Sequence, residues 1–151
     1  MIKKIDITKP SLAKEVLKIQ MPSYKVEAEL IDFDHIPPLK DTVESLQRCE
    51  EIFYGFYKNE QLCGVISIKI ENGVMDIHRL FVHPKYFRKG IAKMLLDFVQ
   101  TNETGFETIT VSTGSDNVPA INFYQKNGFS KEKVIKTAEG LSLTLFKKSI
   151  V

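Results

Sequence analysis

The sequence predicts a mixed α/β fold with a mostly antiparallel central sheet of about seven strands and helices on both faces, in the order β-α-α-β-β-β-α-β-α-β-β. Three consecutive stretches alternate with a period of two, which indicates antiparallel strands: 52–58, 61–71 and 74–82. A helical pattern follows at 90–101, before a further strand. Two more alternating stretches, 130–138 and 141–148, close the chain as a hairpin around Glu139-Gly140.

The amino-terminal segment begins with a strand and then becomes helical. Residues 2–7 alternate enough for a strand, and Thr8-Lys9-Pro10-Ser11 offers a helix cap and a first-turn proline. The apolar stripe that follows predicts a helix ending near Met21-Pro22. A second helical stretch is expected over about 24–31.

Regular structure is then interrupted before the first of the three consecutive strands. Two prolines end the segment 32–38, and a proline disfavours helix at the residue before it. A capping arrangement at 41–44 starts a short helix to about Arg48. The turns between the three strands fall at Asn59-Glu60 and Asn72-Gly73, and both residues of the second pair tolerate a positive φ.

One face of the middle strand is expected in the core. The residues at even positions share that face if the strand is regular. They are almost all apolar: Leu62, Gly64, Ile66, Ile68 and Ile70.

The carboxy-terminal half alternates strand and helix. Residues 108–113 are rich in β-branched side chains and predict a short strand. Asp116 or Asn117 caps a helix to Lys126-Asn127, and Gly128 ends it in the usual C-terminal position.

The composition is that of one globular domain covering 1–151, with 43% hydrophobic and 26% charged residues. A formal net charge of +2 gives no support to non-specific binding of nucleic acid or a membrane. Charges in the first six residues, with no long apolar run behind them, predict neither a signal peptide nor a membrane span. Cys49 and Cys63 lack metal-ligand spacing, so we expect no metal and interpret both as reduced thiols of a cytoplasmic protein.

The stretch 80–96 runs from an apolar strand end through a basic loop into a helix. The first turn of that helix leaves its backbone exposed: Gly90, Ile91 and Ala92. The first N–H groups of a helix have no intrahelical partner and lie at the positive end of its dipole, so they suit a phosphate. Basic residues add positive charge nearby: Arg88, Lys89 and Lys93. The alternative is an ordinary solvated turn.

Neither the dinucleotide fingerprint nor the P-loop occurs here. The segment Phe87-Arg88-Lys89-Gly90-Ile91-Ala92 instead resembles the acyl-CoA-binding motif of the GNAT superfamily of N-acetyltransferases, Gln/Arg-x-x-Gly-x-Gly/Ala. Phe87 takes the Gln/Arg position, which removes a polar side chain from the loop. The resemblance extends over 76–84 and 117–129, and the element order is similar to the GNAT core over essentially the whole chain.

The resemblance implies an N-acetyltransferase that uses acetyl-CoA as cosubstrate. In similar enzymes the strands corresponding to 74–82 and 108–113 diverge, and the pantetheine arm lies in the gap. The pyrophosphate rests on the loop and helix start that follow. The implied cofactor-binding residues are Leu80, Phe81, Val82, Arg88, Lys89, Gly90, Ile91, Ala92, Lys93, Asn117 and Tyr124.

Tyr124 is the residue that the resemblance implies as general acid. In similar enzymes this tyrosine reaches the CoA sulfur and donates a proton to the leaving thiolate. A phenol of pKa about 10 is a workable donor to a thiolate of pKa about 8.5. The alternative is a core aromatic, since Ala120, Phe123 and Tyr124 form an ordinary apolar helix face.

Asp76 and His78 are the candidates for accepting the proton of the attacking amine. An amine of pKa near 10.4 is neutral in only about one molecule in a few thousand at pH 7, so a route for deprotonation is needed. Both residues lie on the strand leading to the acyl site and share one face. The superfamily often has a glutamate there, and no glutamate occurs between Val74 and Val82. The alternative is that both are structural.

The acceptor is expected to be a primary amine of a small molecule or peptide. Six residues are candidates to line its pocket: Tyr24, His35, Glu50, Glu51, Tyr54 and Tyr57. One alternative function is a non-catalytic acyl-CoA-binding sensor, and another is an interaction module that pairs a partner with exposed strand edges. A homodimer is left open.

Overall fold

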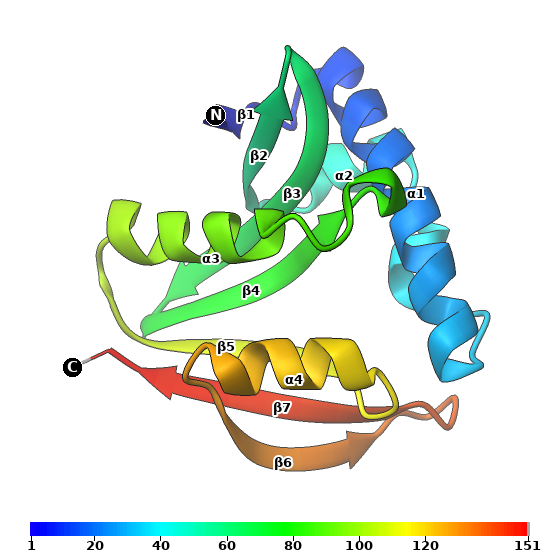
Figure 1. The fold of residues 1–151 in the computed structure, drawn as a ribbon, viewed down its shortest axis with the longest axis vertical. Helices are drawn as coiled ribbons and strands as arrows, with labels where there is room; N and C mark the ends of the chain where they lie inside the picture. Colours follow the sequence, from blue (N-terminus) through cyan, green and yellow to red (C-terminus); the bar gives the residue numbers. More distant parts are fainter. Residues whose placement is uncertain (151) are drawn as a thin grey trace.

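The computed structural model describes residues 1–150 and contains a seven-stranded sheet flanked by helices (Figure 1). The strands are β1 Ile2–Ile5, β2 Ile52–Lys58, β3 Gln61–Glu71, β4 Gly73–Val82, β5 Phe106–Gly114, β6 Ser130–Lys136 and β7 Ser142–Ser149. The helices are α1 Pro10–Ile31, α2 Val43–Arg48, α3 Ile91–Asn102 and α4 Val118–Lys126, with 3-10 turns η1 Pro37–Lys40 and η2 Pro84–Tyr86. The predicted mixed α/β class, strand number and element order are confirmed.

The sheet has the order β1-β2-β3-β4-β5-β7-β6, and all its strand pairs are antiparallel except β4 with β5. That parallel pair begins at Gly73 and Phe106 and ends at Ile77 and Val111. Both strands continue beyond this point, so they diverge into a V that opens towards α1 (Figure 1). The predicted divergence of the two strands is confirmed.

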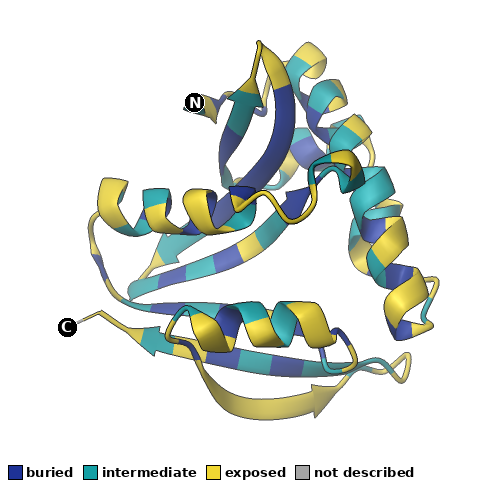
Figure 2. Ribbon diagram, viewed as in Figure 1, coloured by how far each residue is buried: buried dark blue, intermediate teal, exposed yellow. Residues whose placement is uncertain are grey.

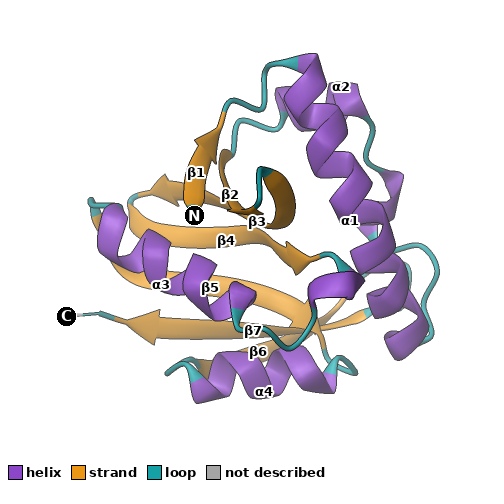
Figure 3. Cartoon of the chain, turned by 45° about the horizontal axis from the view of Figure 1, so that its top comes forward, coloured by secondary structure: helices purple, strands orange, loops and turns teal. Residues whose placement is uncertain are grey.

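Helices cover both faces of the sheet (Figure 3). On one face α3 and α4 pack over a core that includes Leu95 and Phe146, and on the other α1 and α2 pack over a core that includes Val16 and Phe53. Figure 2 shows the contrast between the buried middle strands and the exposed edge strand β6. None of the helices in residues 1–150 has the length and apolar character needed to span a membrane.

The predicted end of the first helix near Met21-Pro22 is wrong, because α1 continues without a break through Pro22 to Ile31. A proline inside a helix removes one hydrogen bond and costs about 3 kcal/mol. Burial outweighs that cost here, since residues three or four apart on both sides of the proline face the sheet: Val16, Gln20, Tyr24, Ala28 and Ile31. The expected side-chain cap is also absent, because Lys9 occupies that position.

The prediction that the even positions of β3 share one face is wrong at Leu62. Gly64 pairs with Phe56 and Leu62 with Tyr57, so Cys63 is an extra residue that forms a β-bulge. Leu62 therefore packs on the α1 and α2 face, whereas Ile66 and Ile68 pack on the α3 and α4 face.

Candidate active site

A cavity of about 500 Å³, which we call the α3 cavity, lies at the start of α3 and the open end of the V. It is lined by parts of α1, β4, η2, α3 and α4. Nine of the predicted cofactor-binding residues line it: Leu80, Phe81, Val82, Arg88, Lys89, Gly90, Ile91, Ala92 and Lys93. The predicted residues of the loop and the strand end therefore meet around one space.

The start of α3 is open to a ligand. Gly90 is the N-cap with a φ of 76°, a conformation that costs glycine little. A Cβ placed on Gly90 would meet no atom within 4 Å, so the space beside the first turn is free. Arg88 and Lys89 are exposed beside it, and the Lys93 ammonium lies 2.7 Å from the Asp97 carboxylate. This arrangement suits a phosphate.

The diverging end of β4 presents backbone groups to the V. Residues Leu80 to Val82 pair with β3 on one side, while pairing with β5 has already ended at Ile77. Tyr24 on α1 faces the Leu80 backbone, whose N–H opposes the rise in the pKa of the phenol. The Tyr24 ring packs on Phe81 at 5.5 Å between centroids. Burial, followed by the charge of Glu27, raises the pKa of Tyr24, so the phenol stays neutral.

A second cavity of about 320 Å³, which we call the Glu27 cavity, opens on the α1 side of the same V. Its lining includes Glu27, His78, the end of β5, η1 and the hairpin between β6 and β7. None of the residues predicted for an acceptor pocket belongs to this lining within the part of the chain that the structure describes: Tyr24, His35, Glu50, Glu51, Tyr54 and Tyr57. Sequence reasoning found His78 but missed Glu27.

The two cavities approach each other along α1. Ser23 lines the α3 cavity and Glu27, four residues later, lines the Glu27 cavity. Four residues of helix span about 6 Å. The two cavities are therefore about one helical turn apart along α1.

His78 and Asp76 lie together, as predicted. Ser67 pairs with Arg79 and Ile68 with Ile77, so His78 is the extra residue of a second β-bulge. The His78 Nε2 atom is 3.1 Å from Asp76 Oδ2, and Nδ1 is 3.5 Å from an oxygen of Glu51. Both ring nitrogens therefore face carboxylates.

The contact between His78 and Asp76 raises the pKa of His78 and lowers the pKa of Asp76 from their ordinary values. The hydrogen bond to Asp76 raises the pKa of His78 against the opposing effect of burial, and the charge of Glu51 adds to the rise. Burial alone would raise the pKa of Asp76, but hydrogen bonds from His78 and Thr110 outweigh it and the pKa is lowered. This pair therefore favours an imidazolium beside a carboxylate.

Arg79 anchors the neighbouring polar network. Its Nε atom donates to Glu51 Oε1 at 2.9 Å, and one terminal nitrogen donates to Asp41 at 2.5 Å and to Gln20 at 3.1 Å. Burial would raise the pKa of Glu51, but hydrogen bonds from Arg79 and Ser67 keep it lowered. Glu51 is thus held as an anion next to His78.

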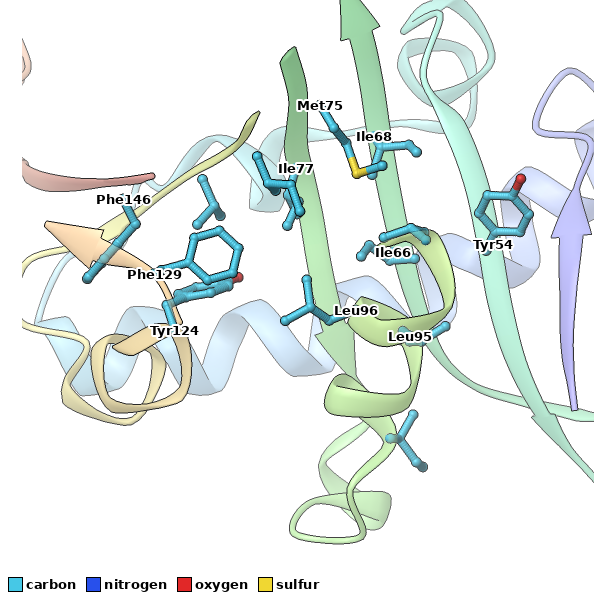
Figure 4. Close-up of a cluster of buried hydrophobic side chains, with 14 of the residues drawn as sticks. Tyr54, Ile66, Ile68, Met75, Ile77, Leu95, Leu96, Tyr124, Phe129 and Phe146 are labelled. Atoms are coloured by element: carbon cyan, nitrogen blue, oxygen red, sulfur yellow. The ribbon is translucent and has the colours of Figure 1, made fainter. Parts of the chain in front are cut away.

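Tyr124 lies in the core between α4 and the sheet (Figure 4). Its ring contacts Phe123, Phe129 and Phe146, with centroids 5.2, 5.4 and 5.8 Å away. Burial, and then the charge of Glu27, raises the pKa of Tyr124. It belongs to the lining of neither cavity in the described residues. The predicted core contacts are present, and the proposed proton transfer stays a prediction.

Asn117 connects α4 with α1. Its Oδ1 accepts a hydrogen bond from the Ala120 N–H, which is the predicted helix cap. Its Nδ2 donates to Glu27 Oε1 at 2.7 Å. Burial raises the pKa of Glu27, and the bond from Asn117 opposes the rise. The sequence signal for Glu27 is only that an acid stands beside the buried stripe of α1.

Within residues 1–150, no group of three or more His, Cys, Asp or Glu side chains is placed to hold a metal ion. Two pairs of polar side chains lie at the V instead, His78 with Asp76 and Asn117 with Glu27. The arrangement can bind an anion at α3 and places ionisable side chains where the strands part.

Comparison with known proteins points to one family. The sequence model of the protein family described as the acetyltransferase (GNAT) family matches residues 13–129 of this chain. The UPF0157 protein YqkA of Bacillus subtilis is 41% identical over 146 residues, which cover 97% of this chain and 43% of that protein. The spermidine N(1)-acetyltransferase of Thermoplasma acidophilum is 29% identical over 62% of this chain and 60% of that protein. The chain thus spans less than two thirds of each relative.

A solved structure has the same fold. The PaiA N-acetyltransferase from Thermoplasma acidophilum, crystallised in complex with coenzyme A, superposes with a TM-score of 0.77 and 21% identity. The match covers 99% of this chain and 98% of that chain. At this identity the likeness concerns the fold.

Proposed function

Because the chain belongs to the acetyltransferase (GNAT) family, we propose that it transfers an acetyl group from acetyl-CoA to a primary amine of a small molecule or peptide. One observation carries the proposal. The α3 cavity joins the diverging end of β4 to the open start of α3, which suits a long thiol cofactor with a pyrophosphate. We further propose that the chain forms a single acyl-CoA N-acyltransferase domain. We also propose that it is cytoplasmic, which agrees with the free thiols of Cys49 and Cys63.

The coenzyme is proposed to bind mainly through backbone. Its pyrophosphate would rest on the first N–H groups of α3 with Arg88, Lys89 and Lys93 around it. Its pantetheine arm would extend along the unpaired side of β4 next to Leu80 and Val82. Phe87 is exposed in the same lining and offers an apolar surface in place of a polar side chain.

The reaction proposed is direct attack of the neutral amine on the thioester carbonyl. A tetrahedral intermediate then expels the thiolate, and Tyr124 is the proposed proton donor to sulfur. Burial, and then the charge of Glu27, raises the pKa of this phenol, so the donor form is present at neutral pH although the phenol is a weaker acid than an exposed tyrosine. Asp76 and His78 on β4 are candidates for accepting the amine's proton; their side chains lie 3.1 Å apart, and of the two only His78 lines the Glu27 cavity.

The amine class is supported by one relative and by the second cavity. A relative named for spermidine acetylation covers 62% of this chain. The Glu27 cavity carries carboxylates at Glu27 and Glu139, and carboxylates attract ammonium groups. A polyamine or a lysine-like amine therefore fits better than an anionic acceptor.

The proposal is tested with acetyl-CoA and three amines: spermidine, 1,5-diaminopentane and Nα-acetyl-lysine amide. Calorimetric titration measures the affinity for acetyl-CoA and for CoA, and thiol release then measures turnover with each amine. We expect binding of both coenzymes and amine-dependent thiol release. Absence of binding would remove the proposed function, whereas binding without release with any amine would favour the acyl-CoA sensor.

A further inference from the structure

The two predicted proton acceptors, His78 and Asp76, are already engaged. His78 directs Nε2 to Asp76 and Nδ1 to Glu51, at 3.1 and 3.5 Å. Thr110 donates to the other oxygen of Asp76 at 2.6 Å. An imidazole accepts a proton only through a nitrogen with a free lone pair. His78 must break a contact before it can deprotonate an amine.

Glu27 has the free acceptor that His78 lacks. Asn117 donates to Glu27 Oε1 at 2.7 Å and thereby fixes the position of the carboxylate. For Oε2, no hydrogen bond or ion pair is present among residues 1–150. Because Glu27 lines the cavity, this oxygen is available to a ligand there.

Glu27 also lies close to the α3 cavity along α1. Ser23, one helical turn earlier, lines the α3 cavity. The charge of Glu27 acts on both Tyr24 and Tyr124, whose phenols come from α1 and α4. The other titratable groups facing the same space are His78 and Glu139.

The remaining walls of the Glu27 cavity define the ligand. Apolar side chains from α1, η1 and the hairpin form most of the surface: Ile31, Ile36, Pro37, Leu141 and Leu143. A largely apolar cavity that carries the Glu27 and Glu139 carboxylates matches a primary ammonium on an aliphatic stem.

We propose that Glu27 binds the ammonium group of the acceptor and takes its first proton. The inference rests on the proposed acetyl transfer and assigns the acceptor site within it. Glu27 receives a proton from the ammonium, and the neutral amine forms a nitrogen–carbon bond to the thioester carbonyl. The carbon–sulfur bond breaks, Tyr124 protonates the thiolate and is itself restored by the proton that the new amide nitrogen loses. Glu27 then releases its proton to solvent.

The test compares Glu27→Gln with Glu29→Gln, which removes an exposed carboxylate from the same helix. The readouts are the acetyl-CoA dissociation constant, kcat and KM in thiol release with each of the three amines above, and the melting temperature. In Glu27→Gln the new amide oxygen can still accept the Asn117 hydrogen bond, so the cap of α4 is kept. Glu27→Asp keeps the negative charge, but the shorter side chain holds the carboxylate one methylene closer to the helix backbone.

We expect Glu27→Gln to lower kcat/KM for the amine at least about 100-fold, with the acetyl-CoA dissociation constant changed less than about twofold. Glu27→Asp should be intermediate, and Glu29→Gln should match the wild type. The melting temperature of Glu27→Gln should equal or exceed that of the wild type, because a half-buried carboxylate whose charged form is disfavoured by burial is lost.

Three results would overturn the inference. Unchanged kcat/KM in Glu27→Gln would exclude Glu27 from the reaction while leaving the proposed acetyl transfer intact. If Glu27→Gln lost activity and also had a lower melting temperature and weaker acetyl-CoA binding, Glu27 would have a structural role and not a catalytic one. A wild type that releases no thiol with any of the three amines would remove the proposed transfer and the inference together.

Discussion

At the scale of single residues, the ring and the hydroxyl of Tyr124 have separable roles. The ring packs against Phe129 and Phe146, which accounts for its burial without any reference to chemistry. The hydroxyl is the atom that the proposed reaction needs. Removing it alone therefore separates packing from proton transfer.

Tyr124→Phe should lower kcat by about 100-fold or more, because positioned acids contribute about 10²–10⁴ to rate. The KM for acetyl-CoA should change little. Stability should change by less than about 1 kcal/mol, since the ring contacts are kept. Steady-state kinetics and urea unfolding measure these quantities, and an unchanged kcat would leave Tyr124 as a core aromatic.

His78 makes stability depend on pH. Its pKa is raised in the folded chain, first through the hydrogen bond to Asp76, so the folded state holds its proton more tightly than the unfolded state. The stability that His78 contributes is therefore complete below its ordinary pKa of about 6.5 and is lost as pH rises through the folded value.

The difference in melting temperature between the wild type and His78→Gln should accordingly be largest near pH 6 and shrink as pH rises. Thermal unfolding at several pH values above about 5.5 measures it, where the carboxylates of Asp76 and Glu51 stay ionised. His35→Gln, in an exposed loop, serves as the control. A difference that grows with pH would contradict the imidazolium assignment.

At the scale of elements, the start of α3 depends on one backbone conformation. Gly90 and Gly73 both have a φ near 77°, at 76° and 77°, and neither has an atom within 4 Å of a Cβ position. The two glycines therefore carry the same backbone strain if substituted. Only Gly90 lines the α3 cavity.

Gly90→Ala and Gly73→Ala should each lower stability by about 1 kcal/mol. Only Gly90→Ala should weaken CoA binding, by about tenfold or more, because its methyl group enters the space beside the first turn. Calorimetric titration with CoA and urea unfolding of both variants provide the comparison. Equal CoA affinities in the two variants would remove the phosphate site from the start of α3.

At the scale of the whole molecule, the Arg79 network holds together segments that are far apart in sequence. It links β4 to Gln20 on α1, to Asp41 before α2 and to Glu51 before β2. Gln20 also donates to the Pro38 carbonyl at 2.9 Å, so the network reaches the wall of the Glu27 cavity. The side chain of Arg79 is only 11% exposed.

Arg79→Met should lower the free energy of unfolding by about 3 kcal/mol, because it removes the guanidinium that pairs with both the Asp41 and the Glu51 carboxylates. Lys93→Met removes an exposed ion pair with Asp97 and should change stability by less than about 1 kcal/mol. Urea unfolding of both variants measures the contrast. Similar small losses would show that the network adds little to stability.

Much of the fold could be predicted from the sequence, because the deciding interactions are local. The period of two marks the consecutive strands whatever surrounds them. The positive φ values of Asn72 and Gly73, the Asn117 cap and the Gly128 helix end each depend on only a few neighbouring residues. The small residues Gly90 and Ala92 likewise marked the open start of α3. The sequence therefore determined the element order and the position of the α3 cavity's loop.

Tertiary structure alone decided the features that depend on contacts between distant segments. Burial of one face of α1 stabilises the helix enough for it to continue past Pro22. The β-bulges at Cys63 and His78 changed which side chains of β3 and β4 share a face of the sheet. Asn117 and Glu27 meet although 90 residues separate them. Such contacts depend on sheet register and packing, which short-range propensity does not encode. For this reason the sequence located the proposed coenzyme site, whereas only the folded chain identified the carboxylate opposite it.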